Sequence, residues 1–499
     1  MSKIKNVVIA GGGTAGWMAA AALSKLLGKN LSITLVESDD IATVGVGEAT
    51  IPPLLTFHQL LGIKEADFMA ATQATFKLGI EFQNWQSVDE SYIHSFGAVG
   101  RECWAAGFQH FWLRGLQLGI TDDYGEYCLE LEAAKANKFS HSHSPPLRYA
   151  YHLDSSLYAQ YLRKFSEDLG VKRIEGKIVN VAIDNSNGNI ESLHLDSGLT
   201  IDGDLFIDCT GFIGLLIEKA LHTGYEDWSH WLPCDSAVAV QTETTQDAIP
   251  YTRSIAHEAG WQWRIPLQSR VGNGLVYCSR YCSDEQAKSL LLNNVDGEPI
   301  TDVKTIKFRT GQRNKHWNKN CIALGLAGGF IEPLESTSIH LIQRGILRLI
   351  QLFPVSSINQ QDIDEYNQLT KLEMVSIRDF IILHYHLNER KDDRFWWHCN
   401  NMSIPESLAH RIQLFENSGR YFYKDDELFG EYSWVQVMLG QGIKPKSYHP
   451  IVDLMSPKEL TVFLKNIRNS IKQTLSTMPS HQHYIQKYCP VENQKTDER

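Results

Sequence analysis

The chain has 499 residues, of which 43% are hydrophobic and 21% charged, and a formal net charge of -11. This length suffices for two or three domains with their own cores, and the composition is that of a globular protein. Such acidity argues against a nucleic-acid binder, which needs basic patches for its phosphate contacts. The nine cysteines lack the paired spacing of a zinc site, so we expect reduced, structural thiols and no metal.

The amino terminus shows no targeting pattern, because the residues after Met1 run directly into a short predicted strand and then glycines. No apolar run reaches membrane-spanning length. We therefore expect a cytoplasmic protein. Two histidine pairs, His141/His143 and His481/His483, lie in polar stretches without a cysteine or an acidic complement, and we interpret them as loop histidines.

A strand, a glycine-rich turn and a helix open the chain. Residues 6–10 predict a buried strand, and a helix is predicted from Trp17 to Leu27. The turn between them matches the dinucleotide fingerprint, in which glycines allow close approach to a pyrophosphate. A second strand over residues 31–36 ends at Glu37, whose carboxylate can accept from a ribose 2′-hydroxyl. The pattern indicates FAD or NAD. The fingerprint residues are Gly11, Gly13, Thr14, Ala15 and Gly16.

Three later stretches favour FAD and an α/β, two-part FAD-binding fold. Residues 42–52 are spaced by glycines and include Gly47, Glu48 and Ala49. Residues 174–205 alternate like a β-meander, with a turn at Asn187-Gly188. A strand over residues 205–212 carries Asp208 and ends in a glycine turn. Since the chain has one dinucleotide fingerprint, no separate NAD(P)H domain is evident, which indicates that the flavin arrives already reduced.

Residues 328–339 form the stretch around which the rest is organised. They follow a predicted buried strand at residues 321–327 and precede a helix predicted to begin at Ser336 or Thr337. Such a turn presents free N–H groups at the positive end of the helix dipole and can hold a small anion. Glu335 lies beside that site. A carboxylate next to an anion site is electrostatically unfavourable, and such pairs are typical of functional sites. The alternative is a serine N-cap with a solvated glutamate.

The remaining chain predicts two domains. Residues 101–138 are aromatic-rich and predicted helical, and residues 149–154 predict a strand that leads into a helix. The apolar spacing of residues 339–350 indicates a core helix. From Asp362 onward the chain is predicted to be mainly helical. We therefore expect an FAD-binding domain at residues 1–355, with an inserted helical segment at about 100–145, and a substrate-covering helical domain at residues 356–499.

One further motif points to a family. One stretch resembles the Trp-x-Trp-x-Ile-Pro signature of flavin-dependent tryptophan halogenases. It reads Gly260-Trp261-Gln262-Trp263-Arg264-Ile265-Pro266. It occurs in the expected order with residues 11–20, residues 45–52, Lys77 and Pro333-Leu334-Glu335-Ser336-Thr337. Taken alone, the two tryptophans would be one face of a strand, and Lys77 would be a snorkelling lysine on a helix. Together the motifs cover about the first 350 residues.

The resemblance implies a reaction. Reduced FAD (FADH2) and O2 would form a C4a-hydroperoxide that oxidises chloride or bromide to hypohalous acid, and Lys77 would deliver the halogen to an aromatic carbon. Glu335 would stabilise the positive charge that develops on the ring. A separate NAD(P)H-dependent flavin reductase is implied as the partner. The resemblance assigns halide binding to Thr337 and Ser338, further cofactor contacts to Gly325 and Ser336, and the tunnel and substrate contacts to His94, Phe96, Trp261, Trp263, Ile265 and Pro266.

The sequence departs from the family pattern in two places. Ser336-Thr337-Ser338 stands where members often have Ser-Thr-Gly. Members that act on free tryptophan carry a tyrosine pair, a glutamate and a Trp-Asn, and the nearest residues here, Tyr421-Phe422-Tyr423, Glu427 and Trp434, match poorly. His94-Ser95-Phe96 resembles the His-x-Phe pair that sandwiches an indole, although a turn with a packed phenylalanine gives the same pattern. Ring recognition is therefore better supported than amino-acid recognition.

Two other functions remain open at this point. A flavoprotein monooxygenase of similar fold would insert oxygen, need no halide and tolerate replacement of Lys77. A flavin-binding protein that has lost catalysis would be expected to have lost Lys77 or Glu335, and both are present.

Overall fold

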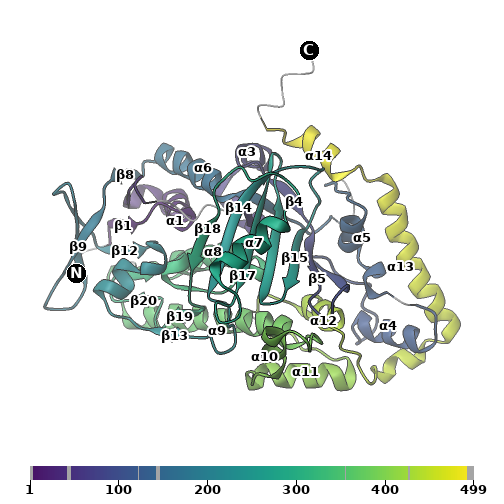
Figure 1. The fold of residues 1–499 in the computed structure, drawn as a ribbon. Coiled ribbons are helices and arrows are strands. Elements are labelled where there is room, and N and C mark those ends of the chain that lie inside the picture. Colours follow the sequence, from purple (N-terminus) through teal and green to yellow (C-terminus); the bar gives the residue numbers. More distant parts are fainter. Residues whose placement is uncertain are drawn as a thin grey trace, which may run out of the picture. The chain divides into compact units, whose positions relative to one another are not determined.

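The computed structural model describes residues 4–41, 47–121, 123–141, 146–354, 356–424 and 427–491 (Figure 1). The chain forms two compact units, each assembled from three stretches. Unit 1 comprises Met1–Ala74, Leu153–Asp235 and Lys307–Val375, and unit 2 comprises Thr75–His152, Ser236–Ile306 and Ser376–Arg499. The predicted division after residue 355 falls inside the last stretch of unit 1 and stays a prediction.

Unit 1 contains a six-stranded sheet in the order β20-β21-β12-β1-β2-β8. All neighbours pair in parallel except β20 and β21. The central strand β1 is flanked by β2 on one side and by β12 on the other, so the strand order reverses there; ligands of such sheets bind at the carboxyl ends beside this point. The bounds are β1 Asn6–Ala10, β2 Ser32–Glu37, β8 Lys172–Glu175, β12 Leu205–Asp208, β20 Trp317–Asn318 and β21 Cys321–Ala323.

Helices and two small sheets complete unit 1. Helix α1 packs against α6 and α8, and α2 also packs against α8. The helices are α1 Thr14–Leu26, α2 Pro53–Leu61, α3 Glu65–Ala71, α6 Ser155–Asp168 and α8 Ser338–Gln351. The small sheets join β9 Ile178–Ile183, β10 Ile190–Leu195 and β11 Thr200–Asp202, and β13 Tyr225–Asp227, β19 Gly311–Arg313 and β22 Gly329–Phe330.

Most predicted elements of unit 1 are confirmed. The meander is present as the antiparallel β9-β10-β11 sheet, and Gly188 in its turn has a φ of 74°. The strand predicted over residues 321–327 was too long. It ends at Ala323 because Gly325, with a φ of 61°, turns the chain into a short 3-10 helix, Gly325–Ala327.

Unit 2 contains a seven-stranded sheet in the order β18-β14-β17-β16-β15-β5-β6. The pair β15 and β5 is parallel. Strands β15, β16 and β17 form an antiparallel meander, and β14 pairs antiparallel with β17. Helix α7 (Asp284–Asn293) packs on β14 and β17 (Figure 1). The strands are β5 Gly79–Gln83, β6 Ser91–Ser95, β14 Ser236–Glu243, β15 Thr252–His257, β16 Gly260–Pro266, β17 Arg270–Tyr277 and β18 Lys304–Lys307.

The other helices of unit 2 come from its first and last stretches. Helix α13 packs against α4 and α5 (Figure 1), and α12 packs against β6. Helix α9 (Gln360–His386) begins in unit 1 and ends in unit 2. The helices are α4 Phe108–Gln117, α5 Leu129–Lys135, α10 Arg394–Asn401, α11 Glu406–Ser418, α12 Glu431–Gly440, α13 Pro457–Thr477 and α14 His481–Tyr488.

Two sequence predictions for unit 2 were wrong in part. The helical segment predicted from Arg101 begins only at Phe108, since Gly100 and Trp104 both have positive φ. His481 is no loop histidine; it opens α14 and is 1% exposed. His483 lies in the same helix, His141 lies outside helices and strands, and His143 lies outside the described residues.

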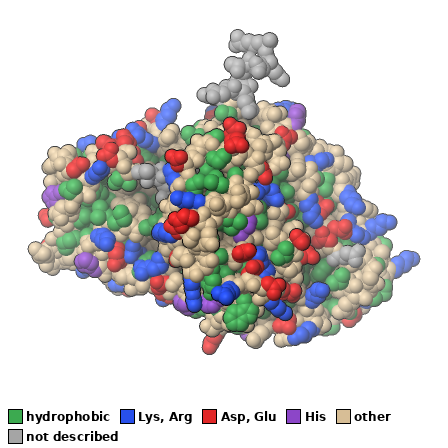
Figure 2. Space-filling view, viewed as in Figure 1, with side chains coloured by type: hydrophobic (Ala, Val, Ile, Leu, Met, Phe, Trp, Pro, Cys, Tyr) green, Lys and Arg blue, Asp and Glu red, His purple; other side chains and the backbone are tan. Residues whose placement is uncertain are grey.

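Acidic and basic side chains are interspersed over the face of the protein drawn in Figure 2. No helix in the described ranges is long and apolar enough to cross a membrane. Within the same residues, no group of three or more His, Cys, Asp or Glu side chains is arranged to hold a metal ion. All nine cysteines are described and none forms a disulfide.

Candidate functional site

The glycine-rich turn after β1 has the geometry of a pyrophosphate-binding loop. Gly11 has a φ of 104°, and its N–H donates to Val36 O at 2.8 Å. A Cβ at Gly16 would lie 1.9 Å from the carbonyl oxygen of Gly11. The N-cap of α1 is Gly13, and no side chain caps the helix. Thr14 and Ala15, in the first turn of α1, therefore present N–H groups that fit a phosphate.

Glu37 lies directly against this turn, at the end of β2. Its Oε1 accepts from Arg173 Nε at 2.5 Å, which fixes the carboxylate, and its Oε2 lies so close to Gly12 that a Cβ there would come within 1.4 Å of it. A carboxylate held rigidly beside the loop fits the ribose hydroxyls of a dinucleotide. The residues present thus fit the adenosine half of FAD.

Two other predicted cofactor contacts, Asp208 and Gly325, lie outside this loop. Asp208 uses both oxygens on its own chain, accepting from the N–H groups of Thr210, Leu216 and Ile217, and so shapes the turn after β12. Gly325 approaches α1 closely, since a Cβ there would lie 3.0 Å from Ala15 Cβ.

The glycine-spaced segment is described only from Gly47 onward. Gly47, Glu48 and Ala49 form the short strand β3, and burial raises the pKa of the Glu48 carboxyl to about 7. Residues 42–46, which carry the first glycine of this motif, lie outside the described residues.

The central turn of unit 1 places a buried carboxylate beside an open helix end. Glu335 closes a 3-10 turn, Ser336 has a φ of 60°, and α8 begins at Ser338 with Thr337 as its N-cap. Glu335 and Thr337 are both fully buried, so the alternative of a solvated glutamate was wrong. A non-glycine residue with this φ is a common mark of functional sites.

Thr337 offers a donor for an anion. Its Oγ1 is buried and has no hydrogen-bond partner among the described residues, and no side chain caps α8. The free N–H groups at the start of the helix and this hydroxyl suit a small anion such as a halide.

Lys77 lies in unit 2 on a strand, which excludes the alternative of a snorkelling helix lysine. Strand β4 (Thr75–Lys77) pairs antiparallel with β7 (Ala150–Asp154), with Thr75 opposite His152. The side chain of Lys77 is fully buried, and Nζ lies 5.2 Å from the centroid of the Phe96 ring. An amine held against an aromatic face is stabilised by a cation–π interaction.

His94 and Phe96 project to the same side, because they are two residues apart on β6 and its extension. Between them Ser95 is fixed by Gln436, whose Oε1 accepts from the Ser95 N–H at 3.1 Å and from its hydroxyl at 2.9 Å. The His94 ring lies 5.7 Å from Phe380. His94 lies within β6, whereas Phe96 follows the last residue of that strand in a bend.

The motif strand β16 carries Trp261, Trp263 and Ile265 on one side by alternation. The two indole rings lie 6.1 Å apart. Trp263 lies over Gly274 on β17, where a Cβ would come within 2.0 Å of its ring. Trp263 Nε1 is buried and has no hydrogen-bond partner in the described part of the chain. The strand therefore presents one unused buried donor.

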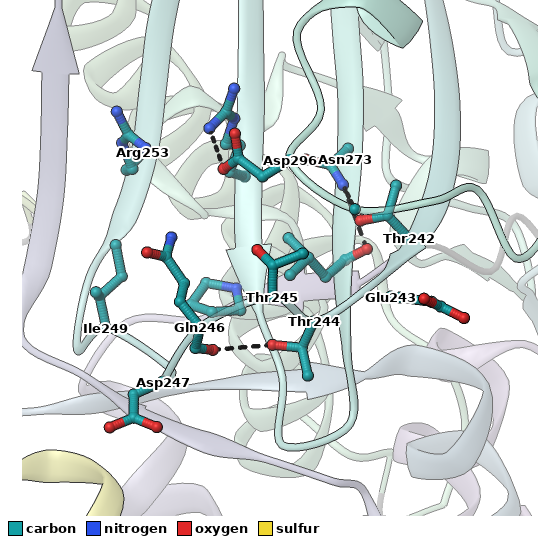
Figure 3. A pocket seen from close by; sticks show the side chains of 14 residues that line it. Thr242, Glu243, Thr244, Thr245, Gln246, Asp247, Ile249, Arg253, Asn273 and Asp296 are labelled. Atoms are coloured by element: carbon teal, nitrogen blue, oxygen red, sulfur yellow. Dashed lines mark hydrogen bonds and ion pairs between the residues drawn. The ribbon is translucent and has the colours of Figure 1, made fainter.

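The opposite side of β16 faces a small hollow of about 40 Å³ that is lined mainly by polar side chains (Figure 3). Arg264 and Pro266 line it, and Arg264 forms an ion pair with Asp296 at 2.6 Å. Lys77, Phe96 and the two tryptophans are not among the residues that line it. Among the predicted tunnel residues, Pro266 lines the hollow, and by alternation it lies on the side of β16 opposite Trp261 and Trp263.

A family model described as tryptophan halogenase matches residues 6–457. The chain belongs to the tryptophan halogenase family. It is 35% identical to the tryptophan 6-halogenase SttH of Streptomyces toxytricini, over 96% of this chain and 97% of that protein. The predicted family and the α/β fold are therefore confirmed.

Two solved flavin-dependent halogenases are similar over nearly their whole lengths. Xcc4156 from Xanthomonas campestris shares 57% identity with a TM-score of 0.97, covering 98% of this chain and 99% of that one. BrvH from Brevundimonas sp. BAL3 shares 43% identity with a TM-score of 0.94, covering 98% and 100%. Flavin-dependent halogenases use FAD and a halide, which is consistent with the loop and the helix end described above.

The carboxyl-terminal residues that match the free-tryptophan members poorly are tied to one another. Arg411 donates to both oxygens of Glu427, and Tyr421 donates to Glu427 Oε2 at 3.0 Å. The Arg411 guanidinium lies 4.7 Å from the centroid of the Trp434 ring. The charge of Glu427 is thus neutralised within the protein.

Sequence reasoning missed three residues that contact predicted site residues or their strand within unit 2. Arg411 lies in α11 without a distinguishing pattern. His152 sits in a predicted strand and His481 in a polar stretch, and both contact β4. The sequence signal that could have identified one of these residues was a histidine within an otherwise apolar predicted strand. That signal was present for His152 alone.

Proposed function

We propose that this protein is an FADH2- and O2-dependent halogenase that makes hypohalous acid from chloride or bromide and delivers the halogen through Lys77 to an electron-rich aromatic carbon, indolic or tryptophan-like. The observation that carries the proposal is the complete burial of Lys77 on β4 against the Phe96 ring. A buried lysine is costly to a fold and marks a site where its chemistry is used.

In unit 1 the residues hold the cofactor and the halide. The loop from Gly11 to Gly16 binds the pyrophosphate, and Glu37 binds the ribose. When bound, reduced FAD together with O2 supplies the oxidant for the halide. The N–H groups of Thr337 and Ser338 and the Thr337 hydroxyl hold the halide at the start of α8.

Lys77 and Glu335 act on the oxidant and on the ring. Lys77 holds hypohalous acid by a hydrogen bond from Nζ, or captures the halogen as a haloamine. Glu335 stabilises the positive charge that builds on the ring during electrophilic substitution. Trp261, Trp263, Ile265 and Pro266 wall the path of the oxidant, and the Trp263 N–H offers it a donor.

The substrate in this proposal is an indolic ring without an amino-acid end. Glu427, the nearest match to a glutamate that holds a substrate ammonium, already accepts from Arg411 and Tyr421. Binding a cationic group there would require this ion pair to open. His94 and Phe96 contact the ring. A separate NAD(P)H-dependent flavin reductase in the cytoplasm supplies the reduced flavin.

The test is product formation followed by mass spectrometry. Purified protein receives FAD, a flavin reductase, NADH and bromide or chloride, with indole and tryptophan in separate reactions. We expect a halogen isotope pattern with indole, none with tryptophan, and none with Lys77→Ala. Halogenated tryptophan would contradict the role given to Glu427. An oxygenated product without halogen, unchanged by Lys77→Ala, would overturn the halogenase and favour a monooxygenase.

A further inference from the structure

Strand β4, which carries Lys77, is only three residues long, and two buried histidines from distant parts of the chain hold it. By alternation Thr75 and Lys77 share one side of the strand and Phe76 lies on the other. His152 contacts the Thr75 side chain, and His481 contacts the Phe76 backbone. Both histidines are at most 1% exposed.

The hydrogen bonds around His152 determine its tautomer. The Thr75 hydroxyl donates its one proton to Pro266 O at 2.8 Å, so it can only accept from His152 Nδ1, which lies 2.9 Å away. In a neutral ring Nε2 then accepts, and its partner at 2.9 Å is the Thr252 hydroxyl. His152 is therefore an Nδ1–H imidazole that links β4 and β7 to β15 and to the end of the Trp-x-Trp motif strand.

His481 is fixed in the same way. Its Nδ1 lies 2.7 Å from Ala248 O, a group that only accepts, so Nδ1 carries the proton. Its Nε2 accepts from the Phe76 N–H at 3.2 Å. Helix α14 thereby satisfies the backbone of the lysine strand.

Both rings stay uncharged near neutral pH. Burial lowers the pKa of His481 to about 4. Burial, followed by the nearby Lys77 and His481, holds the pKa of His152 well below its ordinary value. Lys77 is thus bordered by imidazoles that add no second positive charge to its surroundings.

We propose that His152 and His481 are positioning residues for Lys77, two neutral Nδ1–H imidazoles that fix β4 and thereby aim Nζ at the Phe96 ring. The effect on catalysis rests on the function proposed for Lys77, whereas the tautomers and the position of Lys77 do not. A displacement of a reacting group by about 1 Å can lower a rate by about a hundredfold.

The test exploits the different geometry of two amides. An asparagine amide reaches the position of Nδ1, and a glutamine amide reaches the position of Nε2. The contact to β4 uses Nδ1 at position 152 and Nε2 at position 481. We therefore expect His152→Asn and His481→Gln to keep the ratio of halogenated product to released hypohalous acid, and His152→Gln and His481→Asn to lower it about tenfold or more.

A packing role for the two rings would not produce this crossed pattern. If the same amide were preferred at both positions, or if Asn and Gln were equivalent at both, the positioning role would be overturned.

Spectroscopy on the ligand-free, full-length protein separates this inference from the halogenase proposal. We expect two-bond ¹⁵N–¹H spectra to show Nδ1–H tautomers for His152 and His481, and the Lys77 Hε protons to be shifted upfield by the Phe96 ring. His152→Gln should move that shift toward the value of an exposed lysine. An Nε2–H tautomer at either position in the wild type would overturn the proposed positioning role of His152 and His481. Wild-type protein with these signatures but without halogenated product would refute the proposed function instead.

Discussion

At the scale of single residues, the Thr337 hydroxyl lowers the folding stability of the ligand-free protein. Its buried Oγ1 has no partner among the described residues, and such a hydroxyl costs about 1–3 kcal/mol. We expect Thr337→Val, which keeps the shape of the side chain, to raise the free energy of unfolding in urea by about 1 kcal/mol. The same change should weaken halide binding, seen as a higher KM for halide with indole as substrate.

Thr370 on α9 provides the matched control. It is also buried, but its hydroxyl donates to Tyr366 O at 2.7 Å and accepts from Arg348 at 3.3 Å. Thr370→Val should lower the free energy of unfolding by about 1 kcal/mol. Equal losses in the two variants would mean that the Thr337 hydroxyl is bonded in solution and is no free donor for a halide.

At the scale of elements, α8 is joined to α9 by one buried carboxylate. His340, Arg344 and Arg348 are spaced by four residues, so they share a face of α8, and all three contact Glu373 on α9. Burial alone would raise the pKa of Glu373, but the hydrogen bond and charge of His340, with the two arginines, lower it to about 2. This contact fixes the helix whose amino end forms the predicted halide site.

The sign of the pH dependence follows from that lowered pKa. A carboxyl whose pKa falls from 4.5 to about 2 on folding contributes stability that is complete above pH 4.5 and is lost as the pH drops toward 2. We expect Glu373→Gln to reduce the free energy of unfolding near neutral pH by about 3 kcal/mol and to flatten its decline in that acidic window. Urea unfolding at a series of pH values measures both effects.

Arg344→Ala is the comparison for this pair of helices. Its side chain is 36% exposed and contacts the same carboxylate at 3.2 Å, so its loss should cost under about 1 kcal/mol. If Glu373→Gln proved equally mild, the carboxylate would not be the group that joins the helices.

The same helices show where sequence reasoning ends. The apolar spacing of residues 339–350 predicted α8 correctly, because an amphipathic helix has a local period. The partner of His340, however, lies 33 residues later, and no local pattern connects the two. Similarly, Lys77 and Glu335 were predicted from motifs of contiguous residues, whereas His152, His481 and Arg411 make contacts between distant segments and leave no such motif.

At the scale of the whole molecule, the chain is interleaved. A single boundary was predicted after residue 355, since the composition changes there from mixed to mainly helical. Each unit draws on three stretches of the chain. Within unit 1, Asn367 on α9 accepts from the N–H groups of His316 and Trp317. Within unit 2, Arg114 donates to Val452 O and the Phe76 N–H donates to His481. A cut after residue 355 therefore severs contacts inside both units.

This arrangement predicts that residues 1–355 and residues 356–499, produced as separate fragments, cannot fold alone. Residues 1–355 would keep α8 without α9, leaving Arg348 buried without Glu373, and would keep β4 without His481. Residues 356–499 would lack the seven-stranded sheet against whose strand β6 helix α12 packs, and α4 and α5, against which α13 packs. We expect neither fragment to show a cooperative urea transition by circular dichroism, whereas the full chain does. A cooperative transition in the 1–355 fragment would establish the predicted boundary as a true folding boundary and would show that contacts to α9 are dispensable for unit 1.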